Sequence, residues 1–225
     1  MTTIAETTAR LTASDGHSFD AFVARPEGES LGGLVILQEI FGVTDQLKGV
    51  ARDYAGHGFT TLVPALFDRA RPGTVVPFDQ PETGRDLMMS LDPAKVLLDI
   101  EAAADFADDG KGASVLGFCW GGGLALHAAI GLDLKGAVAF YGTRLGEVLG
   151  PDLKCPMQFH FGATDTHSPP EIIDAVRQKA PGAEIFIYEA GHAFANEARP
   201  ATYVADATQQ AHGRALEFLQ RLYGA

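Results

Sequence analysis

Residues 113–126 read Ala-Ser-Val-Leu-Gly-Phe-Cys-Trp-Gly-Gly-Gly-Leu-Ala-Leu and give the strongest indication of the fold. An apolar run of strand length leads directly into a run of small residues of helical character. At the junction stands Gly117-Phe-Cys119-Trp-Gly121, a G-x-C-x-G pattern. Flanking glycines permit a tight turn between strand and helix, which holds the central side chain out at the edge of a sheet. The pattern therefore predicts a nucleophile elbow with Cys119 as the nucleophile.

The position of Cys119 at a predicted helix start adds an electrostatic effect. The positive end of the helix dipole favours a thiolate over a thiol. The alternative is that Cys119 is a small buried apolar residue, as most free cysteines are, but its glycine setting argues against this. Cys155, in Leu-Lys-Cys-Pro-Met, has no such setting and is expected to be a core residue.

The rest of the chain alternates between short apolar runs and amphipathic stretches. Such alternation predicts an α/β fold: a mostly parallel central sheet with an antiparallel N-terminal portion and helices on both faces. We expect strands at 35–37, 60–63, 113–116, 136–140, 157–161 and 184–188, helices at 44–57, 93–108, 121–131, 169–179 and 201–222, and a hairpin around 16–24. No repeat or linker divides the chain, so we predict a single domain over residues 1–225. Residues 64–92 carry several prolines and few periodic apolar positions, which predicts a long irregular connection of the kind that forms an active-site wall or lid.

Composition excludes several classes of protein. The 225 residues are 46% hydrophobic and carry a net charge of -12, which argues against a partner bound through phosphates or anionic lipid heads. No run reaches the roughly 20 apolar residues that cross a bilayer, and the first residues lack the basic start and apolar core of a signal peptide. We therefore expect a cytoplasmic protein, without nucleic-acid or membrane partners, and a monomer. No histidine pair has ligand spacing, so we expect no metal and no cofactor.

A cysteine nucleophile needs a base, and the base needs a group that fixes its tautomer. Asp165 follows the predicted strand 157–161, and His192 follows the next strand, 184–188. Both positions lie at the carboxyl ends of strands, the edge where such sheets place their ligands. His167 is a rival for the base because it stands two residues after Asp165, but His192 is favoured. His160 lies inside an apolar strand and is expected to be a core histidine.

Acyl transfer also requires donors for the developing oxyanion. In an elbow of this kind they are backbone N–H groups of the residue after the nucleophile and of the loop after the third strand. These correspond to Trp120 and to the region Glu39–Gly42.

Four segments together resemble the dienelactone hydrolase family of α/β-hydrolases: Leu37-Gln-Glu-Ile-Phe-Gly-Val43, Gly117-Phe-Cys-Trp-Gly-Gly-Gly123, Gly162-Ala-Thr-Asp165 and Gly191-His-Ala-Phe194. The similarity spans nearly the whole chain. It implies an α/β-hydrolase fold and a triad of Cys119, Asp165 and His192, with oxyanion N–H groups from Ile40 and Trp120. It also implies that Glu39 interacts with the resting thiol and is displaced as substrate binds.

The resemblance further implies arginines that grip the carboxylate of a lactone substrate. Arg85 is the nearest match to the first, after a one-residue shift in the alignment. The second falls on Asn196, and Arg199 stands three residues further along the chain. Of two neighbouring aromatic positions after the sixth strand, the first is changed to Phe140 and Tyr141 is retained.

These features predict a carboxylic ester hydrolase that cleaves an ester or lactone through a Cys-His-Asp triad and a thioester acyl-enzyme. The substrate implied by the resemblance is carboxymethylenebutenolide, which yields maleylacetate, or a related lactone or ester. Two alternatives stay open. One is a thiol-based redox sensor that uses Cys119, with Cys155 as its only candidate resolving cysteine. The other is a hydrolase-fold binding protein without turnover.

Overall fold

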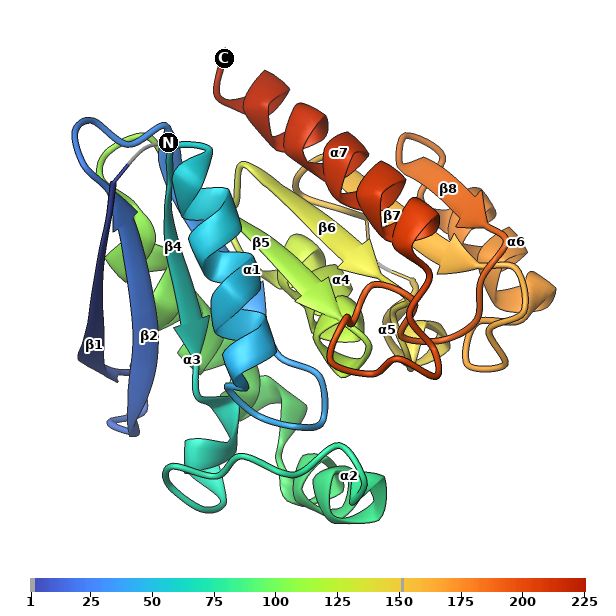
Figure 1. Ribbon diagram of the computed structural model, residues 1–225, viewed down its shortest axis with the longest axis horizontal. Coiled ribbons are helices and arrows are strands. Elements are labelled where there is room, and N and C mark those ends of the chain that lie inside the picture. The colour runs from blue at the N-terminus through green and yellow to red at the C-terminus, as the bar shows by residue number, and fades with distance from the viewer. Residues whose placement is uncertain (1–2, 151) are drawn as a thin grey trace. The chain divides into compact units, whose positions relative to one another are not determined.

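The computed structural model describes residues 3–150 and 152–225. The chain divides into two compact units, one ending at Ser114 and the other beginning at Val115. Each unit is an α/β assembly with its own strands and flanking helices (Figure 1). The expectation of a single domain over residues 1–225 stays a prediction.

The first unit begins with the predicted hairpin. Strands β1 (Ile4–Thr12) and β2 (Ser18–Pro26) pair antiparallel, with Leu11 opposite Phe19. β2 also pairs antiparallel with β4 (Phe59–Pro64), which pairs in parallel with β3 (Gly32–Leu37). All residues of β3 and β4 are buried, as expected of strands covered on both faces.

Two helices cover the sheet of the first unit, α1 (Asp45–Gly56) in front of the strands and α3 (Pro93–Ala107) behind them in Figure 1. Helix α3 begins at the predicted Pro93 and α1 one residue after the predicted Thr44, and each has a side-chain cap. The Thr44 hydroxyl accepts from the Leu47 N–H, and the Asp92 carboxylate accepts from the Ala94 N–H.

The second unit is built on parallel strands. The strand order is β5 (Ala113–Phe118), β6 (Gly136–Phe140), β7 (Met157–Gly162) and β8 (Glu184–Tyr188). β6 pairs in parallel with β7, and β7 with β8. Helices α4 (Trp120–Gly131) and α7 (Ala205–Leu222) lie on opposite sides of these strands in Figure 1, and α5 (Leu145–Val148) and α6 (Pro170–Lys179) complete the unit. The predicted change from antiparallel to parallel pairing along the chain is confirmed.

The segment 64–92 is more ordered than the sequence predicted. It contains a short 3-10 helix, η1 (Leu66–Arg69), and a ten-residue helix, α2 (Pro81–Ser90). Pro81 occupies the first turn of α2, where a missing N–H does no harm and the fixed φ favours the helix. The prolines that suggested an irregular connection therefore include one that starts a helix.

The last helix begins later than predicted, at Ala205 in place of Ala201. Val204 is extended, and its N–H binds the carbonyl of Phe194. The Thr208 hydroxyl binds the same carbonyl. These two bonds hold the chain against the loop after β8 and delay the helix by four residues.

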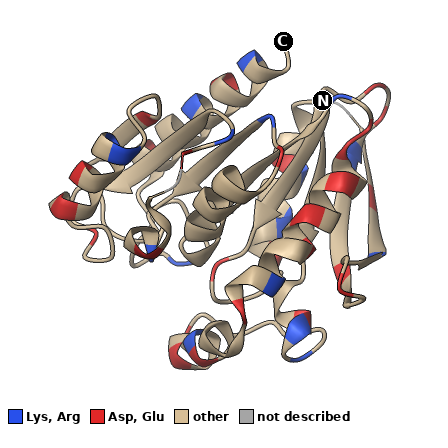
Figure 2. Ribbon diagram, turned by 180° about the vertical axis from the view of Figure 1, so that it is seen from behind, with Lys and Arg blue, Asp and Glu red and all other residues tan. Residues whose placement is uncertain are grey.

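Acidic residues, 29 against 17 lysines and arginines, are spread over the helices and loops of both units (Figure 2). Among the described residues, no helix is long and apolar enough to cross a membrane.

A buried ion pair joins η1 to α3 in the first unit. Arg69 donates from Nε and Nη2 to both oxygens of Asp99, at 2.6 and 2.8 Å, and from Nη1 to Asp15 at 2.8 Å. The Asp99 side chain is fully buried, and burial raises the pKa of its carboxyl despite the guanidinium. The geometry is bidentate, which is the arrangement that best offsets the desolvation of both groups.

A second buried polar network lies in the second unit around His160. Its ring makes two hydrogen bonds, one between Nδ1 and the Tyr188 hydroxyl (2.8 Å) and one between Nε2 and Gln158 Oε1 (2.7 Å). Because an amide oxygen only accepts, Nε2 carries the proton and Tyr188 donates to Nδ1. Burial lowers the pKa of His160 well below its usual range, with His212 and Arg214 adding to the effect. The prediction of a core histidine at this position is confirmed.

Removing Arg69 is expected to destabilise the protein strongly. Arg69→Met leaves Asp99 as an uncompensated buried charge, which costs about 3–5 kcal/mol in the free energy of unfolding measured by urea titration. The control is Arg10→Met, which breaks the exposed pair of Arg10 with Asp20 and should cost less than about 1 kcal/mol. Equal losses in the two variants would contradict the assignment.

Stability at acid pH should depend on His160. Its pKa is lowered in the folded protein, so the unfolded chain binds the additional proton, and folding loses free energy as the pH falls below about 6.5. Melting temperatures measured from pH 8 to pH 5 should therefore fall more steeply for the wild type than for His160→Gln. Parallel curves for the wild type and His160→Gln would be incompatible with a buried neutral His160.

Candidate active site

Cys119 stands at the junction of β5 and α4, as the G-x-C-x-G pattern predicts. Its backbone has φ 53 and ψ -115, an unusual conformation for a residue with a side chain. The residue is 9% exposed. Two backbone bonds hold the turn: the Cys119 N–H donates to the Phe140 carbonyl, and the Thr143 N–H donates to the Cys119 carbonyl, both at 3.0 Å. The elbow is thus fixed to the loop that follows β6.

Glycines around the elbow are required by close backbone approach. A Cβ on Gly117 would collide with the Gly121 carbonyl, and one on Gly123 would collide with the Thr143 carbonyl. A Cβ on Gly122 would lie 2.7 Å from the Cα of Gly142. The run of glycines in the sequence therefore reflects packing of α4 against both its own strand and the loop after β6.

Asp165 and His192 lie in the loops that follow β7 and β8. His192 Nδ1 lies 2.8 Å from Asp165 Oδ2. The other carboxylate oxygen accepts from the His167 backbone N–H at 2.8 Å. The Asp165 side chain is fully buried, whereas the His192 side chain is 20% exposed. Asp165 therefore fixes the ring orientation of His192 and leaves Nε2 for another partner.

Cys119 also influences the charge of the His192 ring. Burial by itself lowers the pKa of His192, but hydrogen bonds to Asp165 and Cys119, together with the charges of both groups, raise it to about 10. Asp165 and Cys119, both in the second unit, thus act in the same direction on the pKa of His192.

Aromatic rings pack against His192. The Tyr141 ring meets it edge-on, with centroids 5.3 Å apart, and packs in the same way on Phe194. The exposed His167 ring lies 4.5 Å from the His192 ring. His167 was the sequence rival for the base, but it is His192 whose ring binds Asp165. Phe194 was not singled out from the sequence, although its place two residues after His192 was a usable signal.

The two positions expected to contact a substrate carboxylate in this unit differ in character. Asn196 is buried, and its Oδ1 accepts from the Ala198 N–H at 3.1 Å. Arg199 is half-buried, and its N–H donates to the Asn196 carbonyl. The two residues belong to one turn, so Arg199 stands next to the position at which the resemblance expects an arginine.

In the first unit, Glu39 and Ile40 follow the end of β3. Glu39 is buried. The Gln38 side chain accepts from the Leu66 N–H at 3.1 Å and donates to the Glu39 carbonyl at 3.3 Å, which joins this loop to the start of η1. Gly42 has φ 82, and a Cβ there would collide with the Thr74 carbonyl. The backbone that carries Glu39 and Ile40 is thus held on both sides.

Arg85 lies on α2 and is exposed, on a helix and not in the irregular loop that the sequence suggested. The preceding residue, Gly84, is buried, and a Cβ on it would collide with the Ile40 carbonyl. Packing of α2 on the loop after β3 therefore places Arg85 one residue from the contact with Ile40.

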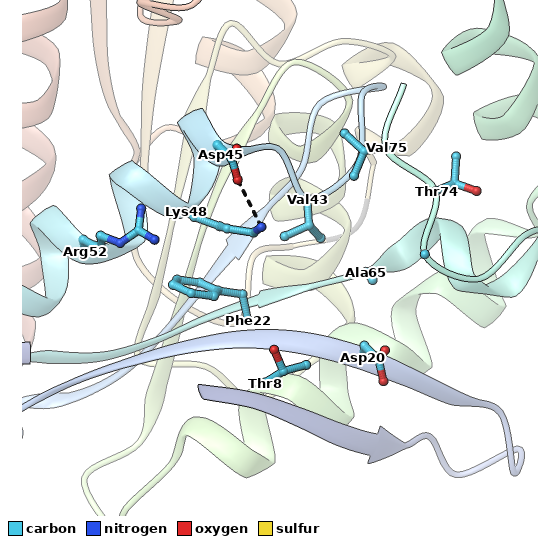
Figure 3. Close-up of a pocket in the computed structure, with 11 residues that line it drawn as sticks. Thr8, Asp20, Phe22, Val43, Asp45, Lys48, Arg52, Ala65, Thr74 and Val75 are labelled. Atoms are coloured by element: carbon cyan, nitrogen blue, oxygen red, sulfur yellow. Dashed lines mark hydrogen bonds and ion pairs between the residues drawn. The ribbon is translucent and has the colours of Figure 1, made fainter. Parts of the chain in front are cut away.

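A separate concavity of about 430 Å³ opens in the first unit beside α1 and contains none of the predicted site residues (Figure 3). Phe22 lies beneath Lys48 and Arg52. The charged groups that line it are paired: Lys48 with Asp45, Arg52 with Glu6, and Asp20 with Arg10. Such mutual neutralisation leaves little field to attract a charged ligand.

Among the described residues, no three side chains of His, Cys, Asp or Glu are grouped so that they could hold a metal ion.

Comparison with known proteins identifies the family. The dienelactone hydrolase family model matches residues 19–223. The chain belongs to the dienelactone hydrolase family. It is 34% identical to a carboxymethylenebutenolidase from Pseudomonas putida, over 92% of this chain and 93% of the relative. A solved structure from Klebsiella pneumoniae, assigned as a dienelactone hydrolase, superposes with a TM-score of 0.81 at 26% identity and covers 98% of this chain and 99% of its own.

Membership in the dienelactone hydrolase family establishes two of the expectations from the sequence. The fold is that of an α/β-hydrolase, and the protein is a hydrolase that acts on small-molecule esters or lactones. A metagenomic dienelactone hydrolase-like phosphotriesterase, 22% identical with a TM-score of 0.75, shares the fold.

The charge of His192 provides a direct test of the site geometry. Asp165→Asn and Cys119→Ser each remove a group that raises its pKa, so both should lower that pKa from about 10 in the folded protein. The measurement is titration of the His192 ring nitrogens by NMR. Asp174→Asn removes an exposed carboxylate on α6 that pairs with Arg177 and should have no effect. An unchanged pKa of His192 in Asp165→Asn would refute the coupling.

Proposed function

We propose that this dienelactone hydrolase family member cleaves its ester or lactone through Cys119, His192 and Asp165 by way of a thioester. The observation that supports the proposal is the position of His192: its ring lies 2.8 Å from Asp165, and Asp165 and Cys119 together raise its pKa to about 10 despite burial. A protonated base beside a sulfur nucleophile is the arrangement from which acylation by a cysteine triad proceeds.

Acylation begins when the Cys119 thiolate attacks the carbonyl carbon and a C–S bond forms. The backbone N–H of Trp120, at the start of α4, is a donor for the oxyanion. Collapse of the tetrahedral intermediate breaks the C–O bond, and the leaving oxygen takes the proton from His192 Nε2. In a lactone the leaving group stays tethered to the acyl group.

Deacylation returns the site to its starting state. His192, now neutral, takes a proton from water, and the hydroxide attacks the thioester carbonyl. The C–S bond then breaks, which releases the carboxylic acid and restores the thiolate beside the imidazolium. Asp165 holds the ring throughout and stabilises the imidazolium each time that it forms.

The proposed substrate class rests on the family and on the positions, such as Asn196, at which this chain departs from the family pattern. A lactone of the carboxymethylenebutenolide type is the first candidate, with Arg199 beside Asn196, and Arg85, as groups for a substrate carboxylate. The roles of Glu39, Ile40, Arg85, Tyr141 and Arg199 stay predictions from the sequence, as do a cytoplasmic location, a monomeric state and the absence of a cofactor.

The surroundings of Cys155 disfavour the alternative of a redox sensor. Burial, with the charge of Asp133, raises the pKa of its thiol to about 11. A buried thiol that stays protonated is a poor resolving partner for a sulfenic acid, because the thiolate is the attacking form.

Cys119→Ala is expected to lower hydrolysis of an activated ester by at least ~10³-fold, because the nucleophile is lost while the binding groups remain. The measurement is kcat/KM on a short-chain p-nitrophenyl ester and on a panel of lactones with and without a carboxylate. Cys155→Ala is the matched control and should retain near-native turnover. Near-native hydrolysis by Cys119→Ala would reject the proposed mechanism.

A further inference from the structure

Ser168 is a buried serine whose hydroxyl joins two loops of the second unit. It lies three residues after Asp165, just before the start of α6, and is 1% exposed. Its Oγ donates to the Gly142 carbonyl at 2.7 Å, and its N–H donates to the Asp165 carbonyl at 3.3 Å. One residue thus closes the turn that carries the acid and binds a loop 26 residues away in sequence.

The loop that accepts this bond is fixed to the elbow. Gly142 packs against Gly122 in the first turn of α4, with the would-be Cβ of Gly122 only 2.7 Å from the Gly142 Cα. The next residue, Thr143, donates its N–H to the Cys119 carbonyl. A displacement of Gly142 would therefore move the backbone that determines the conformation of Cys119.

The turn that carries Asp165 is fixed just as closely to the loop of His192. The N–H groups of Ala163 and Thr164 donate to the Tyr188 and Ala190 carbonyls, and the Thr164 hydroxyl binds Ala190 again at 3.1 Å. Asp165 and His192 therefore form one body, held together by backbone bonds and by their own side-chain bond. Cys119 belongs to another body, formed by the elbow and the loop after β6, which the bond from the Tyr141 N–H to the His160 carbonyl also joins to β7.

We propose that Ser168 is a positioning residue that sets the distance between these two bodies, and so between His192 and Cys119. The inference rests on the proposed function, in which the Cys119 thiolate attacks the substrate and His192 protonates the leaving oxygen. Its basis is the hydroxyl bond to Gly142, a side-chain link that is made neither by the triad nor by the strand ladder. Small misplacement of reacting groups lowers rates far more than it lowers binding.

If Ser168 had only a structural role, its replacement would lower stability without a specific loss of kcat. Loss of a buried hydrogen bond lowers stability wherever it occurs, because it leaves the carbonyl without its donor. Ser30 in the first unit supplies the comparison. It is also buried, and its Oγ donates to the Gly32 carbonyl and accepts from the Thr60 N–H. Ser30→Ala therefore removes buried bonds of a serine hydroxyl within the first unit.

The experiment compares Ser168→Ala, Ser168→Thr and Ser30→Ala in the full chain. For Ser168→Ala we expect kcat on a p-nitrophenyl ester to fall roughly 10- to 100-fold with KM nearly unchanged. We also expect the pKa of His192, measured by NMR, to fall toward its value in the Cys119→Ser variant. Ser168→Thr keeps the hydroxyl and should restore kcat, and Ser30→Ala should lose stability without a change in either readout.

The outcomes separate the inference from the proposed function. If Ser168→Ala leaves kcat and the pKa of His192 at wild-type values, or changes them no more than Ser30→Ala does, Ser168 is not a positioning residue. If Ser168→Thr does not fold, the comparison of Ser168→Ala with Ser30→Ala decides. If Cys119→Ala retains ester hydrolysis, the proposed function fails, while the pKa of His192 in Ser168→Ala still reports whether Ser168 sets the distance.

Discussion

The backbone of Cys119 lies in the left-handed region, and the loops of the second unit are arranged around that one turn. Such a conformation costs of the order of 1–3 kcal/mol for a residue with a side chain, so it persists only where the surroundings determine it. Two kinds of contact hold this backbone in place. The Cys119 backbone is hydrogen-bonded to Phe140 and Thr143, and Gly122 packs closely on Gly142. This backbone conformation holds the sulfur of Cys119 at the edge of the sheet, at the start of α4.

Strand order then accounts for the rest of the site. β7 and β8 are neighbours and run parallel, so the residues that follow them emerge at the same edge. Asp165 follows β7 and His192 follows β8, and adjacency of the strands alone brings the carboxylate within 2.8 Å of the ring. The loop after β6 contributes Tyr141, which packs on His192. Residues distant in sequence meet because the sheet places their loops together.

This dependence on strand ends explains what could be predicted from the sequence. Strands β6 and β8 have the predicted bounds, since apolar runs with clear flanking residues are local signals. Asp165 and His192 could be chosen because each follows such a run. Helix α2 was missed because its apolar positions are few, and its contact is a glycine, Gly84, packed on the Ile40 carbonyl. A backbone carbonyl is present at every residue, so the sequence does not show that Ile40 or Gly142 is the partner in such a contact. For the same reason Ser168, which binds the Gly142 carbonyl, could not be singled out.

Two histidines of the second unit, His160 and His192, show how the neighbouring groups decide whether a ring is charged. Burial lowers the pKa of both His160 and His192. His160 is hydrogen-bonded to the neutral groups of Gln158 and Tyr188, and His212 and Arg214 lower its pKa further, so the ring stays neutral within the core. His192 faces a carboxylate on one side and a sulfur on the other, and these outweigh burial. A histidine of the core and a histidine fit for proton transfer are therefore made in neighbouring strands and loops by a change of partner alone.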